Sequence, residues 1–99
     1  MKKDIPEDLK NKIIQLINII FPDVPLYLFG SRARGDHHQW SDIDLALDGG
    51  KKLDEKNIHQ ISDILSALNI PYKIDIVDIY AVSSDLHKEI MKDRILWKL

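Results

Sequence analysis

The sequence predicts one α/β (α+β) domain, a small mixed sheet of three to four strands flanked by helices. Segments with helical periodicity alternate with short apolar segments, which is the order expected when helices pack on a sheet. The 99 residues are enough for a single hydrophobic core, and 44% of them are hydrophobic. Because no repeat or linker interrupts the chain, we expect residues 1–99 to form a single domain.

The first half of the chain predicts a helix and two strands. Apolar residues recur at the spacing of one helical face over residues 7–20. A short apolar strand follows over residues 26–29 and ends at Gly30, after which residues 31–34 could start a helical turn. The next strand covers residues 43–47. Its connection to the first strand is short and polar, so we expect the two strands to be antiparallel.

The second half predicts two more helices and one or two strands. A helix with one apolar side extends over about residues 54–68. Residues 72–79 alternate between apolar and polar side chains, as a strand does. Ser83 and Ser84 can cap a last helix, and residues 95–97 can add a short edge strand.

Charge and composition exclude several classes of protein. The net charge of −2 argues against a protein whose main role is to coat nucleic-acid phosphates, and we expect no direct nucleic-acid binding. The absence of cysteine excludes disulfides, thiolate catalysis and cysteine-based zinc sites. No apolar run approaches the roughly 20 residues of a membrane helix, and no secretory signal is evident. We therefore expect a cytoplasmic protein.

The first candidate site is the pair Gly30 and Ser31 at the end of a strand. Glycine lets a backbone pass close to a ligand, and the N–H groups at the start of a helix favour phosphate oxygens. Ser31 adds a hydroxyl donor. By itself the pair is a weak signal, because Gly-Ser is frequent in ordinary turns.

The second candidate is the pair of carboxylates Asp42 and Asp44, which point to the same side of one strand. Two such charges are unfavourable unless they are protonated, paired with cations or bound to a metal. Mg²⁺ binds carboxylate oxygens and leaves positions for substrate phosphates. The alternatives are an exposed strand edge or pairing with Arg32 and Arg34.

A third carboxylate, Asp75, lies in the middle of the third expected strand. Its side chain points to the opposite side of the strand from those of its apolar neighbours Ile74 and Ile76. If that strand lies beside residues 43–47, Asp75 joins Asp42 and Asp44 on one face. Three carboxylates could then hold two Mg²⁺ ions for a phosphoryl or nucleotidyl transfer. Asp78 is the second choice, because parity places it on the opposite face.

Two further residues have competing interpretations. Arg34, and less so Arg32, could contact phosphate or pyrophosphate, or could pair with Asp36 or with the acidic cluster. Trp40 lies in the loop before Asp42 and could contact a nucleotide or a partner.

Together these residues resemble the signature of the polymerase-beta-like nucleotidyltransferase superfamily. Gly30 and Ser31, ten further residues and then Asp42-Ile43-Asp44 match its motif. The fuller string GSRARG…SDIDL, with IDIVD at residues 74–78, resembles the minimal nucleotidyltransferase (MNT) domain proteins. With the flanking helices, the resemblance covers nearly the whole chain.

The resemblance implies an enzyme that transfers AMP from ATP with the help of two Mg²⁺ ions and releases pyrophosphate. Gly30 and Ser31 would hold the triphosphate, and Asp42 and Asp44 would bind both metals. Asp75 would complete the metal site nearer the acceptor and could accept its proton.

The resemblance also implies a partner. Minimal nucleotidyltransferases commonly act as antitoxins, in what we term a type VII-like toxin–antitoxin system. They neutralise a HEPN-family ribonuclease toxin by adenylylating one of its tyrosines. Two other functions remain open: a catalytically silent antitoxin that acts by binding alone, and a nucleotidyltransferase for a small-molecule acceptor such as an aminoglycoside.

Overall fold

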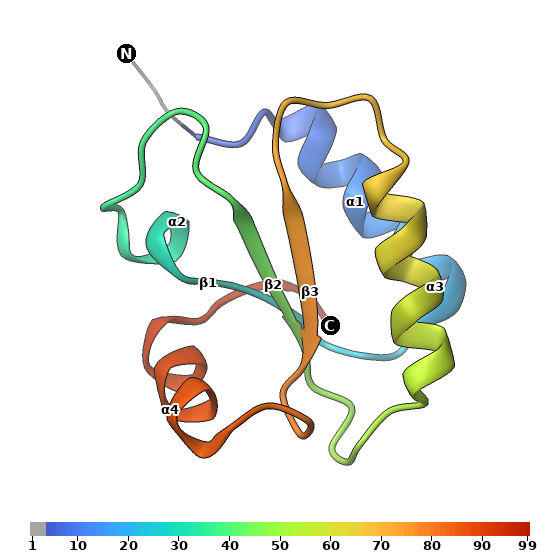
Figure 1. The fold of residues 1–99 in the computed structure, drawn as a ribbon. Coiled ribbons are helices and arrows are strands. Elements are labelled where there is room, and N and C mark those ends of the chain that lie inside the picture. The colour runs from blue at the N-terminus through green and yellow to red at the C-terminus, as the bar shows by residue number, and fades with distance from the viewer. Residues whose placement is uncertain (1–3) are drawn as a thin grey trace.

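The computed structural model describes residues 4–99 as a four-stranded sheet with helices on both faces (Figure 1). Every element expected from the sequence is present, and the bounds differ by only a few residues. In chain order the elements are α1 (Glu7–Ile20), β1 (Leu26–Phe29), α2 (Ser31–Arg34), β2 (Ile43–Leu47), α3 (Glu55–Ser66), β3 (Ile74–Asp78), α4 (Ser84–Asp93) and β4 (Ile95–Lys98).

The sheet is mixed, with the strand order β3-β2-β1-β4. The expected antiparallel pairing of β1 with β2 is confirmed, and β4 also pairs antiparallel with β1. β3 runs parallel to β2, which the crossover through α3 allows. The expectation that β3 lies beside β2 is therefore confirmed, and Asp44 and Asp75 are partners in the register.

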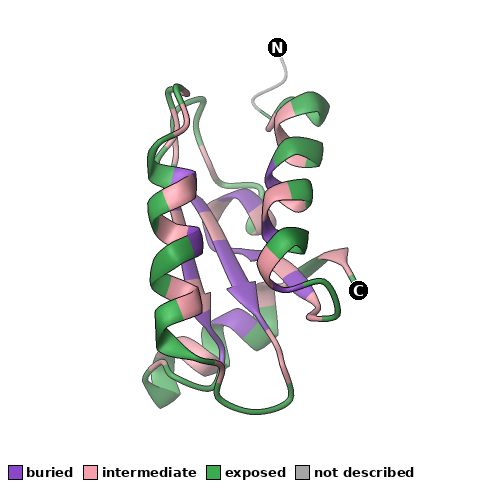
Figure 2. Cartoon of the chain, turned by 90° about the vertical axis from the view of Figure 1, so that its right-hand side faces the viewer, coloured by how far each residue is buried: buried purple, intermediate pink, exposed green. Residues whose placement is uncertain are grey.

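The main core lies between the sheet and the layer formed by α1 and α3. Figure 2 shows the buried positions on the inner sides of these helices and on the strands behind them. The strands supply alternate residues to this core: Ile43, Leu45 and Leu47 from β2, and Ile74 and Ile76 from β3. The helices supply three buried isoleucines and one buried leucine at helical spacing, as the sequence periodicity predicts.

The opposite face of the sheet has a smaller core, which α4 covers. It contains Phe29, Ala46, Ile79 and Ile90, with partly buried Leu86 beside them. Strand alternation places Asp44 on the same face as Ala46, and Asp75 on the same face as Val77. The two carboxylates thus lie on the face of the sheet against which α4 packs.

Local hydrogen bonds explain where two helices begin. The side chain of Asp54 accepts a hydrogen bond from the Lys56 N–H at 2.9 Å, and Ser83 Oγ accepts one from the Leu86 N–H at 3.2 Å. The predicted cap at Ser83 is confirmed. In residues 4–99, no helix has the length and apolar character needed to cross a bilayer.

Candidate active site

A cleft of about 530 Å³ opens on the α4 face of the sheet. Five of the six residues predicted for the site line it, and Asp42 is the exception. The five are Gly30, Ser31, Arg34, Asp44 and Asp75. Gly30 and Asp75, 45 positions apart in the sequence, meet here because β2 pairs with β1 on one side and with β3 on the other. Asp44 is the register partner of Phe29 in β1 and of Asp75 in β3.

Gly30 lies directly against one of the acidic residues. Its φ of 78° falls in the left-handed region that glycine adopts readily, and a Cβ added there would lie 2.5 Å from Asp44 Oδ2. The Gly30 carbonyl accepts hydrogen bonds from Ala33 N and Arg34 N at 3.1 and 3.0 Å, which starts α2. The turn between β1 and α2 therefore needs glycine both for its backbone conformation and for its closeness to the carboxylate.

Asp44 and Asp75 form the centre of the cleft. Both are half-buried, and they are directly paired in the β2–β3 register. Burial raises the pKa of the Asp44 carboxyl, and the negative charges of Asp75 and Asp42 raise it further. Lys73 Nζ lies 3.9 Å from Asp75 Oδ1, but its side chain is 71% exposed and screened by solvent. The site thus concentrates negative charge that a cation would stabilise.

Asp42 lies one residue before β2 and is exposed, outside the lining of the cleft. Across residues 4–99, no three Asp, Glu, His or Cys side chains are grouped as a metal site. Mg²⁺ commonly takes only one or two carboxylates and completes its shell with waters and substrate phosphates. The oxygen donors of Asp44 and Asp75, with the glycine turn against them, fit that mode of binding.

Arg34 lies at the rim of the cleft and contacts three carboxylates. Its guanidinium donates to Asp93 Oδ2 at 2.8 Å, to Asp36 Oδ2 at 3.2 Å and to Glu89 Oε1 at 3.4 Å. The hydrogen bonds to Asp93 and then Asp36 raise the pKa of Arg34 above its ordinary value. The predicted pairing with Asp36 is confirmed, and the contact with phosphate stays a prediction.

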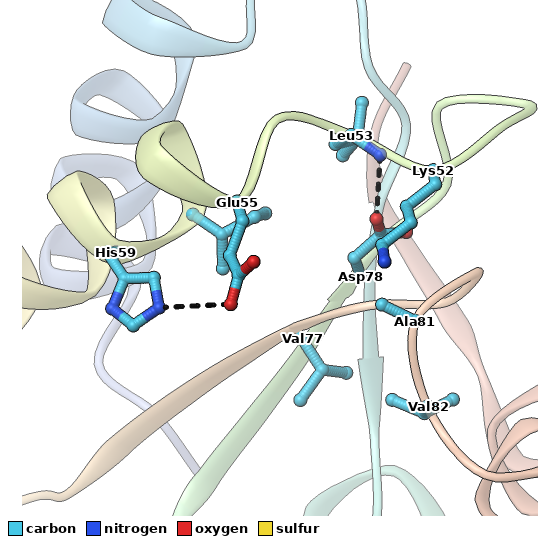
Figure 3. A pocket seen from close by; sticks show the side chains of 9 residues that line it. Lys52, Leu53, Glu55, His59, Val77, Asp78, Ala81 and Val82 are labelled. Atoms are coloured by element: carbon cyan, nitrogen blue, oxygen red, sulfur yellow. Dashed lines mark hydrogen bonds and ion pairs between the residues drawn. The ribbon is translucent and has the colours of Figure 1, made fainter.

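Asp78 faces the other side of β3, as its parity predicts. It is 5% exposed, and its carboxylate accepts hydrogen bonds from Leu53 N at 2.7 Å and Tyr80 N at 2.9 Å. Figure 3 shows it beside a second pocket of about 310 Å³, whose rim carries the ion pair of His59 with Glu55. Asp78 therefore holds two loops together at the far end of the strand.

Sequence reasoning missed three residues at the cleft. Ser62 of α3 lines it, and Glu89 and Asp93 of α4 hold Arg34. The four-residue spacing of Glu89 and Asp93 places both on one side of α4, which was the available signal. Nothing local in the sequence indicates that this side faces α2.

Comparison with known proteins agrees with this geometry. The pattern of the family described as "Polymerase beta, Nucleotidyltransferase" matches residues 7–98. A protein adenylyltransferase, MntA of Shewanella oneidensis, is 32% identical over 90 residues. That match covers 89% of this chain and 64% of the MntA chain, so this chain spans less than two thirds of that relative.

Two solved structures have the same fold. A toxin–antitoxin complex with AMP-PNP contains a chain that is 32% identical, with a TM-score of 0.72 over 90% of this chain and 72% of its own. A tri-AMPylated Shewanella oneidensis HEPN toxin in complex with MNT antitoxin gives 28% identity and a TM-score of 0.67. That second match covers 90% of this chain and 68% of the other.

Proposed function

This chain belongs to the polymerase beta nucleotidyltransferase family, and from that premise we propose that it is an antitoxin with protein adenylyltransferase activity. It transfers AMP from ATP to a tyrosine hydroxyl of a HEPN-family ribonuclease toxin and neutralises it. The observation that carries the proposal is the contact of the Gly30 turn with Asp44 inside a cleft that also holds Asp75. A phosphate-binding turn and metal-binding carboxylates must adjoin for this chemistry.

The residues that line the cleft, together with Asp42 outside its lining, have separate roles in the reaction. The Gly30 backbone and the Ser31 hydroxyl bind the triphosphate, and Arg34 at the rim contacts its oxygens. Asp42, Asp44 and Asp75 would hold Mg²⁺, which would offset negative charge on the phosphates. The tyrosine oxygen forms a bond to the α-phosphorus while the bond from that phosphorus to pyrophosphate breaks. Asp75 accepts the phenolic proton.

The relatives support the choice of nucleotide and acceptor. The related complex with AMP-PNP supports ATP as the substrate. The related complex with a tri-AMPylated HEPN toxin supports a protein acceptor in the same partner class. A mononucleotide attached to a tyrosine near the catalytic residues of a ribonuclease would block RNA by its bulk and charge.

Intact-mass spectrometry tests the proposal directly. A HEPN-family toxin candidate, the product of the adjacent reading frame, is incubated with ATP, Mg²⁺ and either this protein or its Asp42→Ala/Asp44→Ala variant. We expect AMP-sized mass additions with the unmodified protein and none with the variant, and fragmentation should locate them on tyrosine.

Other outcomes separate the alternatives. An unmodified toxin that is nevertheless inhibited by both the protein and its variant would establish neutralisation by binding and overturn the proposal. ATP turnover without any protein partner, on a hydroxyl-bearing small molecule, would assign the chemistry to a different acceptor.

A further inference from the structure

We propose that Arg32 is a positioning residue that sets the place of Asp42 relative to the other two carboxylates. The inference rests on the proposed function, because it concerns the same metal site. Arg32 follows the phosphate-binding Ser31 in α2, yet it is 7% exposed and does not line the cleft. A buried guanidinium needs partners, and Arg32 has partners in segments that carry the site.

Two hydrogen bonds join Arg32 to the loop before β2. Nε donates to the Ser41 carbonyl at 3.0 Å, and Nη2 donates to the Gln39 carbonyl at 2.9 Å. These carbonyls lie one and three residues before Asp42. Because the planar guanidinium presents its N–H groups in a fixed geometry, two bonds to one loop fix both its position and its direction.

A ring contact extends the same connection to β3. The Arg32 Cζ lies 5.0 Å from the centroid of the Tyr72 ring, which is the range of a cation–π interaction. Tyr72 comes three residues before Asp75, and its ring also packs against Trp40 at 5.7 Å between centroids. One side chain thus connects α2, the loop that ends in Asp42, and the start of the strand that carries Asp75.

These contacts distinguish Arg32 from a residue that serves the core alone. Asp44 and Asp75 are held by the β2–β3 pairing, whereas Asp42 lies outside both strands and is exposed. Its position depends on the loop, and the loop depends on Arg32. Loss of the guanidinium should therefore reduce metal affinity, while the groups inside the cleft keep their positions.

The test compares Arg32→Met with Arg94→Met. Arg94 is the matched control because its Cζ lies 4.9 Å from the Tyr27 ring centroid, a similar contact outside the lining of the cleft. Binding of Mn²⁺ alone is measured by the electron paramagnetic resonance of the free ion. Hydrogen–deuterium exchange is followed over residues 36–42, and melting temperature reports the fold.

We expect Arg32→Met to weaken Mn²⁺ binding by about tenfold, the lower end of the effects seen when groups behind metal ligands are changed. Exchange over residues 36–42 should become faster, while Arg94→Met should match the unmodified protein in both measurements. In the transfer assay, the Mg²⁺ requirement of Arg32→Met should rise while KM for the acceptor stays unchanged.

A folded Arg32→Met variant with unchanged Mn²⁺ affinity and exchange would overturn the inference. If Arg32→Met does not fold, Arg32→Lys and Tyr72→Leu take its place, and the same two measurements decide. Neither readout uses ATP or an acceptor, so a failure to transfer AMP would count against the proposed function alone. If the unmodified protein bound no Mn²⁺, the metal site itself would be lost and the inference with it.

Discussion

At the scale of single residues, the cleft places the Asp44 carboxyl where ionisation is unfavourable. Asp44 is half-buried, faces Asp75 in the strand register and lies against Gly30 without room for a Cβ. Each feature limits water around the carboxylate or adds a like charge. Such an arrangement destabilises the folded protein and favours a cation at this position, because a bound cation would offset the repulsion.

Asp44→Asn should stabilise the protein in the absence of divalent cations. The folded state raises the pKa of Asp44 above its ordinary value of 3.8, so the ionised carboxylate destabilises the fold at neutral pH. Removal of the repulsion between two like charges on paired strands raises the free energy of unfolding by about 0.5 kcal/mol. That corresponds to a rise of roughly 2–4 °C in melting temperature for a domain of this size.

The pH dependence of this gain provides its check. As the pH falls through the raised pKa towards 3.8, Asp44 takes up a proton in the folded state and its repulsion disappears. The melting temperatures of Asp44→Asn and the unmodified protein should therefore converge in acid. The exposed Asp63→Asn on α3 is the charge control. A gain that persists at low pH, or that the control shares, would contradict the explanation.

At the scale of elements, β3 carries two acidic residues with different tasks. Asp75 points to the cleft, while Asp78 points to the opposite side and accepts two backbone hydrogen bonds from the loops next to β3. Strand alternation separates them, since they differ by three positions. The same alternation that builds the main core therefore assigns one carboxylate to the site and the other to stability.

Asparagine substitutions should separate these tasks. Asp78→Asn places an NH₂ group against one of two backbone donors, and a buried donor left unsatisfied costs about 1–3 kcal/mol. Asp75→Asn removes a repulsive charge and should leave the melting temperature unchanged or slightly higher, while AMP transfer is lost. Thermal unfolding and the mass-spectrometric assay measure both. If the Asp78→Asn variant folded but lost AMP transfer while the Asp75→Asn variant stayed active, Asp78 would belong to the site and Asp75 would not.

At the scale of the whole molecule, the cleft forms where three parts of the fold come together. β2 and β3 supply the carboxylates, the turn into α2 supplies Gly30 and Ser31, and α4 crosses the same face without covering them. The contacts of Arg34 with Glu89 and Asp93 join α2 to α4 at the rim. A ligand that binds the cleft therefore contacts most of the fold.

Binding of Mg²⁺ and AMP-PNP together should raise the stability of the whole domain. A ligand that binds only the folded state adds about 2.7 kcal/mol at one hundred times its Kd. Asp44→Asn and Asp42→Ala/Asp44→Ala should abolish this increase, and chelation of Mg²⁺ by EDTA should reduce it. Differential scanning fluorimetry measures the shift. Equal stabilisation of the unmodified protein and the double variant would exclude these carboxylates from the nucleotide site.

The sequence by itself determined the elements and most of the site. Helix 7–20 and strand 43–47 were predicted with the bounds that the structure has, because apolar periodicity reports which side of an element is buried. Local rules also predict the strand end at Gly30 and the sides of the strands on which Asp44 and Asp75 lie, whereas their meeting in one cleft depends on strand pairing. A strand that ends in glycine, and the two-residue alternation along strands, are properties of neighbouring residues alone.

Only the tertiary structure decided which distant groups meet. The contacts of Arg34 with Glu89 and Asp93 and the bond of Leu53 N to Asp78 join residues 25 to 59 positions apart in the sequence. The burial of Arg32 against the loop of residues 39–41 joins residues only seven to nine positions apart, but no local pattern indicates it. Local patterns give the side of an element that is buried and not the element that covers it. That choice depends on how the helices and strands pack together. The same packing determines which charged groups surround the candidate site.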